Sequence, residues 1–121
     1  MINCLAVGIG GFIGSIFRYL VGLIPIKNNA GFPINTLIIN VVGAFLIGLI
    51  VTAFSKNADA NGTWLLLLKV GLCGGFTTFS TFSLESMNLI KSGSAGAAAL
   101  YILLSVALSI AAIFFGIAVA K

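Results

Sequence analysis

The stretch GLCGGFTTFSTFS, from Gly71 to Ser83, lies in the third apolar segment of the chain. It places the glycine pair Gly74-Gly75 just before the threonine pair Thr77-Thr78, and both pairs are poor material for a helix. We therefore predict that a membrane helix is interrupted between residues 74 and 78. Irregular backbone inside a membrane survives only where it is buried in protein or lines a polar cavity. Its free carbonyl oxygens could form a site for a small cation, or the break could be a kink that neighbouring helices pack around.

The rest of the chain has the composition of an integral membrane protein. Its 121 residues include six Lys or Arg, two Asp or Glu and no His, and charged residues make up 7%. A soluble domain has roughly 25% charged residues. Eight charges cannot cover a globule of this size, which excludes soluble enzymes, nucleic-acid modules and disordered tails. The net charge of +4 is dispersed along the chain and indicates no polyanionic partner.

An all-α fold with four membrane-spanning helices is predicted within a single domain, residues 1–121. A spanning helix needs about 20 mostly apolar residues. The predicted helices cover about residues 2–24, 34–54, 63–90 and 95–120. Pro25 and Pro33 bracket the first loop, where proline ends one helix and begins the next. No basic residue precedes Arg18, which argues against a secretory signal peptide at the N-terminus.

Basic residues are divided equally between the two predicted sides of the membrane. The side of the termini carries Lys56, Lys69 and Lys121, and the opposite side carries Arg18, Lys27 and Lys91. Since an excess of basic residues normally sets orientation, neither orientation is favoured. We expect a dual-topology chain that pairs with its inverted copy as an antiparallel homodimer. The small-residue faces Gly10-x-x-x-Gly14 and Gly71-x-x-x-Gly75 suit either such an assembly or tight packing within one chain.

Two phenylalanines follow the predicted break. Phe79 and Phe82 stand three residues apart and so share one helical face. Because the edge of an aromatic ring is electropositive, two ring edges beside hydroxyl groups could attract a small anion without a full positive charge. The alternative is that both rings simply face lipid or the protein core.

Other polar side chains fall at membrane depth. Asn40 offers amide donors that suit either an anion or a hydrogen bond between helices. Tyr101, Ser105 and Ser109 recur every four residues, as a row of hydroxyls or as a packing seam. Arg18 is expected to reach the membrane interface or to face a vestibule in which it concentrates anions.

The chain lacks the residues of a catalytic site. It has no His, and its two carboxylates, Asp59 and Glu85, are far apart in sequence. No acid–base or nucleophilic set can be assembled, so we predict that the protein is not an enzyme. Cys4 and Cys73 lack the spacing of a metal site and are predicted to be buried as small hydrophobic residues.

Together, these motifs resemble the Fluc (CrcB) family of fluoride ion channels. The resemblance is carried by residues 10–19, 36–48 and 71–83, and the sequence Gly-Gly-x-Thr-Thr-Phe-Ser-Thr-Phe is its most specific part. It implies an antiparallel, dual-topology homodimer in the bacterial inner membrane, with two pores that let cytoplasmic fluoride leave the cell and lower its toxicity. It also implies a structural sodium ion at the dimer centre, held by the backbone carbonyls of Gly75 and Thr78.

The resemblance further implies which side chains line the fluoride pathway. Phe79 and Phe82 would turn their ring edges toward it, and Asn40 would supply an amide donor. The hydroxyl partners would be Ser80, Thr81, Ser105, Ser109 and Tyr101, and Arg18 would lie near a vestibule. Weak, distributed donors suit a hydrated anion that must be released as well as bound.

Two other classes of membrane protein fit the composition less well. A dual-topology exporter of drugs or guanidinium would need a carboxylate in its first helix, and residues 1–17 contain none. A non-transporting, holin-like assembly protein would leave the broken third helix unexplained.

Overall fold

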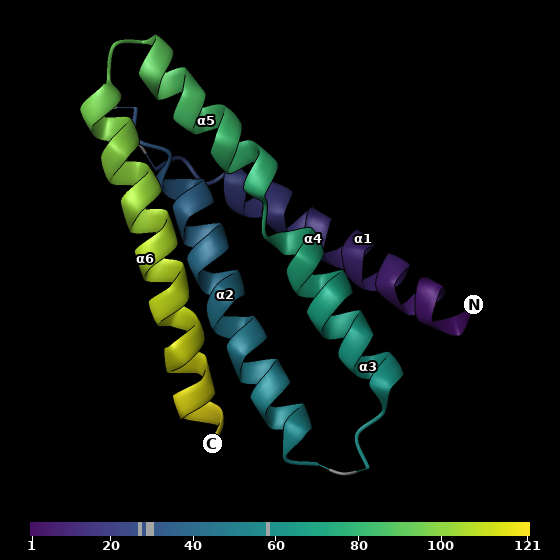
Figure 1. Cartoon of the computed structure of the whole chain (residues 1–121). Helices are drawn as coiled ribbons and strands as arrows, with labels where there is room; N and C mark the ends of the chain where they lie inside the picture. Colours follow the sequence, from purple (N-terminus) through teal and green to yellow (C-terminus); the bar gives the residue numbers. More distant parts are fainter. Residues whose placement is uncertain (27, 29–30, 58) are drawn as a thin grey trace.

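The computed structural model describes residues 1–26, 28, 31–57 and 59–121, and the regular structure within them is entirely helical. Lys27, one of the residues in the predicted charge balance, lies outside these ranges. The elements shown in Figure 1 are α1 (Ile2–Gly22), α2 (Ile34–Ser55), α3 (Gly62–Leu66), η1 (Leu67–Cys73), α4 (Gly74–Phe76), α5 (Phe79–Lys91) and α6 (Ala95–Ala120). The segment from α3 to α5 forms one span, so four helices are long and apolar enough to cross a membrane. The four predicted spans are therefore confirmed.

The third span is interrupted where the sequence predicts. The helix ends at Phe76, and Thr77 and Thr78 are extended, with ψ angles of 159° and 118°. It resumes at Phe79 as α5. Before the break, η1 has the wider turns of a π-helix, a form often found near functional sites.

The helices pack as two groups that meet at the break. In Figure 1, α2 and α6 lie side by side along most of their length, and theirs is the most extensive contact between elements. The second group is formed by α1 against η1 and α4. From the break, α5 continues toward the turn that leads into α6 (Figure 1). Gly93 in that turn has a φ of +86°, a conformation that glycine adopts without strain.

Both predicted small-residue faces are used for packing within the chain. A Cβ atom at Gly14 of α1 would collide with the carbonyl oxygen of Leu72 in η1. A Cβ atom at Gly75 would lie 2.7 Å from the carbonyl oxygen of Gly11. Only glycine allows backbones to approach this closely, so these residues fix α1 against the segment that precedes the break.

Much of the apolar surface remains uncovered by the single chain. Within the apolar window of each span, between 11% and 22% of the residues are buried. The remaining apolar surface must contact lipid or another protein chain.

The two cysteines differ in burial. Cys73 is 2% exposed, as predicted. Cys4 is exposed, so its predicted burial is wrong. The reason is that an apolar residue of a membrane helix can be stable on the outer surface, where lipid replaces a protein core.

The glycine packing leads to a prediction for Gly14→Ala. The added methyl group should force α1 away from η1 and lower the stability of the protein by about 1–3 kcal/mol. Thermal unfolding of the purified protein in detergent would measure the loss. Gly8→Ala is the matched control, because a Cβ atom there meets nothing within 4 Å. Equal unfolding temperatures for the two variants would contradict the proposed packing role.

Candidate functional site

The break is held by the side chain of Asn40, on α2. Its Oδ1 accepts a hydrogen bond from the backbone N–H of Thr78 at 2.8 Å, and its Nδ2 donates to the Thr78 carbonyl oxygen at 3.1 Å. An unpaired backbone group in a membrane would be costly, so this double contact stabilises an extended residue between two helices. The hydrogen bond between helices, one of the two roles considered for Asn40, is therefore present. The amide keeps a second N–H that these two bonds do not use.

Threonine side chains satisfy the helix ends on both sides of the break. Thr77 Oγ1 donates to the carbonyl oxygen of Cys73 at 2.8 Å. Thr78 Oγ1 accepts from the N–H of Thr81 at 3.2 Å and so caps the start of α5. The other N–H groups in the first turn of α5 have no acceptor within that helix, and the helix dipole gives this end a partial positive charge.

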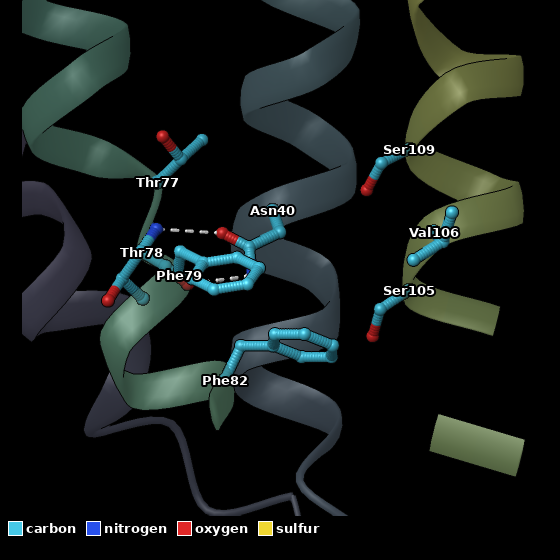
Figure 2. Close-up of a pocket in the computed structure, with 8 residues that line it drawn as sticks. All are labelled: Asn40, Thr77, Thr78, Phe79, Phe82, Ser105, Val106 and Ser109. Atoms are coloured by element: carbon cyan, nitrogen blue, oxygen red, sulfur yellow. Dashed lines mark hydrogen bonds between the residues drawn. The ribbon is translucent and has the colours of Figure 1, made fainter. Parts of the chain in front are cut away.

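A hollow of about 270 Å³ opens beside the break (Figure 2). Its lining residues come from α2, the break, α5 and α6, and they are Asn40, Thr77, Thr78, Phe79, Phe82, Ser105, Val106 and Ser109. We call this space the phenylalanine hollow. In Figure 2, the two phenylalanine rings extend across it toward the serine side of α6. The ring centroids are 5.5 Å apart and the ring planes are inclined by 51°.

Ser105 presents an unpaired hydroxyl to the phenylalanine hollow. The residue is 6% exposed, and its Oγ has no hydrogen-bond partner in the part of the chain that the structure describes. It is the one buried side-chain polar atom there of which this is true. A buried hydroxyl without a partner costs about 1–3 kcal/mol. Ser105 Oγ therefore keeps a hydrogen-bonding capacity that the described residues do not use.

The two phenylalanines have very different surroundings. Phe82 is 9% exposed, whereas Phe79 is 78% exposed. One chain thus encloses the phenylalanine hollow on the side of Phe82 and leaves the side of Phe79 open to lipid or to another chain.

A second hollow, of about 310 Å³, shares Thr78 with the first. Its lining residues are Arg18, Gly22, Pro33, Asn35, Thr36, Ile39, Thr78, Thr81 and Glu85. We call this space the arginine hollow. The Nε of Arg18 donates to the carbonyl oxygen of Gly75 at 3.1 Å, and the other guanidinium N–H groups remain for further contacts. Arg18 thus lines a polar space close to the break.

Not all of the predicted hydroxyl groups line the phenylalanine hollow. Ser105 and Ser109 do, and Thr81 lines the arginine hollow instead. Ser80 is exposed, with its Oγ 3.4 Å from Thr78 Oγ1. Tyr101 is fully buried behind Phe82 and lines neither hollow.

Only Arg18, Thr78 and Thr81 of the arginine hollow were predicted as site residues from the sequence, and the polar residues Thr36 and Glu85 were among those missed. Thr36 lies four residues before Asn40, and this spacing on one helix was the signal for it. Glu85 accepts a hydrogen bond from the Tyr101 hydroxyl at 3.1 Å, a contact between α5 and α6 that sequence spacing does not indicate.

Four apolar spans, a third span with a break, and two hollows that share Thr78 at that break are features of multi-pass membrane channels and transporters. The chain belongs to the family described as CrcB-like protein, Camphor Resistance (CrcB), which matches residues 5–117. This confirms the resemblance found in the sequence.

Bacterial relatives match along nearly the whole chain. A protein of Agrobacterium fabrum named fluoride-specific ion channel FluC is 47% identical over 122 residues, covering 100% of this chain and 98% of its own length. A protein of the same name from Ruminiclostridium cellulolyticum is 46% identical, covering 100% of this chain and 94% of its own. Fluoride-specific ion channel FluC 1 of Yersinia pestis is 50% identical over 107 residues, covering 88% and 84% of the two chains. The chain is thus a multi-pass bacterial membrane protein of an ion-channel family, not an enzyme.

The double contact of Asn40 generates a prediction for Asn40→Asp. The new carboxylate can still accept from the Thr78 N–H, but its other oxygen faces the Thr78 carbonyl without a proton to donate. We expect a loss of stability of about 1–3 kcal/mol, measured by thermal unfolding in detergent. The loss should be larger at alkaline than at mildly acidic pH, because the protonated acid can donate to the carbonyl.

Asn57→Asp is the matched control for this substitution. Asn57 is exposed, and its Oδ1 accepts from the backbone N–H of Asp59, a role that a carboxylate keeps. An Asn40→Asp protein as stable as this control at every pH would show that the amide does not hold the break.

Proposed function

We propose that the protein is a passive, fluoride-selective channel that lets fluoride leave the cytoplasm and so lowers its toxicity. The observation that carries the proposal is the phenylalanine hollow, where the unpaired Ser105 hydroxyl lies with Asn40 and two aromatic rings. The names of the bacterial relatives point to the same ion.

The donors around the phenylalanine hollow suit a small, strongly hydrated anion. Ser105 and Asn40 can donate hydrogen bonds, and the rings of Phe79 and Phe82 have electropositive edges. The N-terminal end of α5 adds a partial positive charge at the same place. None of these groups carries a full charge, so an anion that enters is held weakly enough to leave again.

Arg18 has a separate role in this proposal. Its guanidinium lines the arginine hollow, which Glu85 also lines, and on this proposal the positive charge of Arg18 draws anions toward the break. Thr78 borders both hollows, so the arginine hollow adjoins the phenylalanine hollow, and Arg18 lines only the former.

We further propose that the working unit is an antiparallel, dual-topology homodimer with two pores. The open side of the phenylalanine hollow at Phe79 and the mostly uncovered spans support a second copy of the chain as the missing wall. The equal division of basic residues in the sequence supports insertion in both orientations.

A structural sodium ion at the dimer centre is part of the proposal. Carbonyl oxygens of Gly75 and Thr78 would hold it, and neutral oxygens suit this hard cation. The Gly75 oxygen accepts one hydrogen bond, from Arg18, and the Thr78 oxygen accepts one from Asn40. Each oxygen keeps a second lone pair for the ion. When bound, the ion would supply a fixed charge that ties the breaks of two copies together.

The proposed function predicts rapid and selective efflux from liposomes that contain the purified protein. Vesicles loaded with fluoride should release it passively, as followed with a fluoride electrode, and vesicles loaded with chloride should retain it. Equal rates for the two anions would contradict selectivity. A requirement for a proton gradient would indicate a carrier instead of a channel.

Substitutions of the rings provide the internal test of that assay. Phe79→Ile and Phe82→Ile remove the electropositive edges while keeping apolar bulk, so each should abolish fluoride release and leave the dimer intact on size-exclusion chromatography. Phe12→Ile is the matched control, because Phe12 is 69% exposed on α1 and lines neither hollow. Normal efflux from the Phe79 and Phe82 variants would remove the role assigned to the rings.

The dimer proposal predicts mixed orientation in cells. In a Cys4→Ser background, Lys121→Cys places a reactive thiol at the C-terminal end, and the native Cys73 is buried. A membrane-impermeant maleimide should label about half of the copies in intact cells and all of them after permeabilisation. Labelling of all or none in intact cells would refute dual topology.

The sodium proposal predicts that exchange of sodium for N-methylglucamine lowers the unfolding temperature of the dimer. An unchanged unfolding temperature would refute a structural sodium site.

A further inference from the structure

Four aromatic rings form a continuous series from the first loop to the phenylalanine hollow. Phe32, just before α2, meets Tyr101 of α6 edge-on, with centroids 5.4 Å apart and planes inclined by 83°. Tyr101 lies 5.2 Å from Phe82 of α5. Phe82 in turn lies 5.5 Å from Phe79. The first two rings line neither hollow. Tyr101 contacts the phenylalanine hollow through Phe82, and it contacts the arginine hollow through Glu85.

Tyr101 is fixed within this series. Its relative exposure is 0%, and its hydroxyl donates to Glu85 Oε1 at 3.1 Å. Its ring is in contact with Phe32 and Phe82, in a cluster that also includes Leu89. Because well-packed side chains move only by displacing their neighbours, the position of Tyr101 depends on Phe32 and in turn sets the position of Phe82.

Phe32 is itself fixed through its backbone. Its N–H donates to Asn28 Oδ1 at 2.7 Å, and its carbonyl oxygen accepts from Asn28 Nδ2 at 2.8 Å. The same oxygen accepts from the N–H of Ile34 at 2.9 Å. Pro33 follows and restricts the backbone further. A loop residue with three such contacts can serve as a firm support for Tyr101.

We propose that Phe32 is a positioning residue of the anion pathway, which holds the Phe82 ring in its conducting orientation through Tyr101. This inference rests on the proposed function. Without the Phe32 ring, Tyr101 loses its edge-on partner, and both Tyr101 and Phe82 can relax into the space left behind. Phe82 then presents its edge to the anion for a smaller fraction of the time.

The test is fluoride efflux from liposomes that contain at most one dimer per vesicle on average. The fraction of the trapped fluoride that is released measures how many vesicles contain a working channel. The time constant of the release measures the transport rate of each channel. Phe32→Leu should slow efflux per channel between about twofold and about tenfold, the range that one aromatic contact is worth. The extent of release should remain that of the wild type. Phe32→Tyr keeps the ring and should restore the rate.

Two further variants separate positioning from general packing. Asn28→Ala removes both hydrogen bonds to the Phe32 backbone without changing any ring, and it should slow each channel in the same way. Phe45→Leu is the matched control, since it removes a different aromatic contact between α2 and α6, with Phe115 at 5.6 Å. Its rate should match the wild type.

Several results would overturn the inference. It fails if Phe32→Leu releases fluoride at the wild-type rate, or if the variant lowers the extent and leaves the rate unchanged, which would mark Phe32 as a purely structural residue. It also fails if Phe45→Leu slows efflux as much as Phe32→Leu does. A wild-type protein that releases no fluoride would instead refute the proposed function itself.

Discussion

The two hydrogen bonds between the Asn40 amide and the backbone of Thr78 are the constraint on which the rest of the site depends. A membrane offers no water to an extended residue, so a break in a spanning helix needs partners from the protein itself. One amide satisfies both the donor and the acceptor of Thr78. This contact joins α2 to the point where the third span changes direction, and it places Asn40 beside the phenylalanine hollow.

The break also determines the distribution of partial charge at the site. The helical segment that ends with α4 has carbonyl oxygens at its C-terminal end without helical partners. The segment that begins with α5 has N–H groups at its N-terminal end without helical partners. Carbonyl oxygens attract cations and N–H groups attract anions, so the two ends of the interruption have opposite partial charges a few residues apart. Arg18 donates to the Gly75 oxygen and thereby balances part of the negative end. The phenylalanine hollow lies on the positive end, where neutral donors gather.

Composition and local pattern determined the fold class of this protein and the place of the break. Apolar segments of spanning length predicted all four helices, because the thickness of a bilayer sets a minimum length that few other structures need. The run of glycine and threonine predicted the interruption, because both are weak helix formers. Gly74 and Gly75 remain helical in α4, and the extended residues are Thr77 and Thr78. Spacing put Phe79 and Phe82 on one helical face and the serines of the last helix in one row, and only the family resemblance assigned them to a pathway. The structure places Phe79, Phe82, Ser105 and Ser109 around one hollow.

Only the tertiary structure decided which partner each polar group has. Tyr101 belongs to the same row of hydroxyls as Ser105, but it is buried against Phe32 and bonded to Glu85, and neither contact follows from helical spacing. Arg18 lies 57 residues from Gly75 in sequence and donates to its carbonyl oxygen in the fold. The helical period depends only on residues that are close in sequence, so the sequence was enough to assign each residue to one face of its helix. The choice of contact across that face depends on how distant helices pack, and no local pattern carries that information.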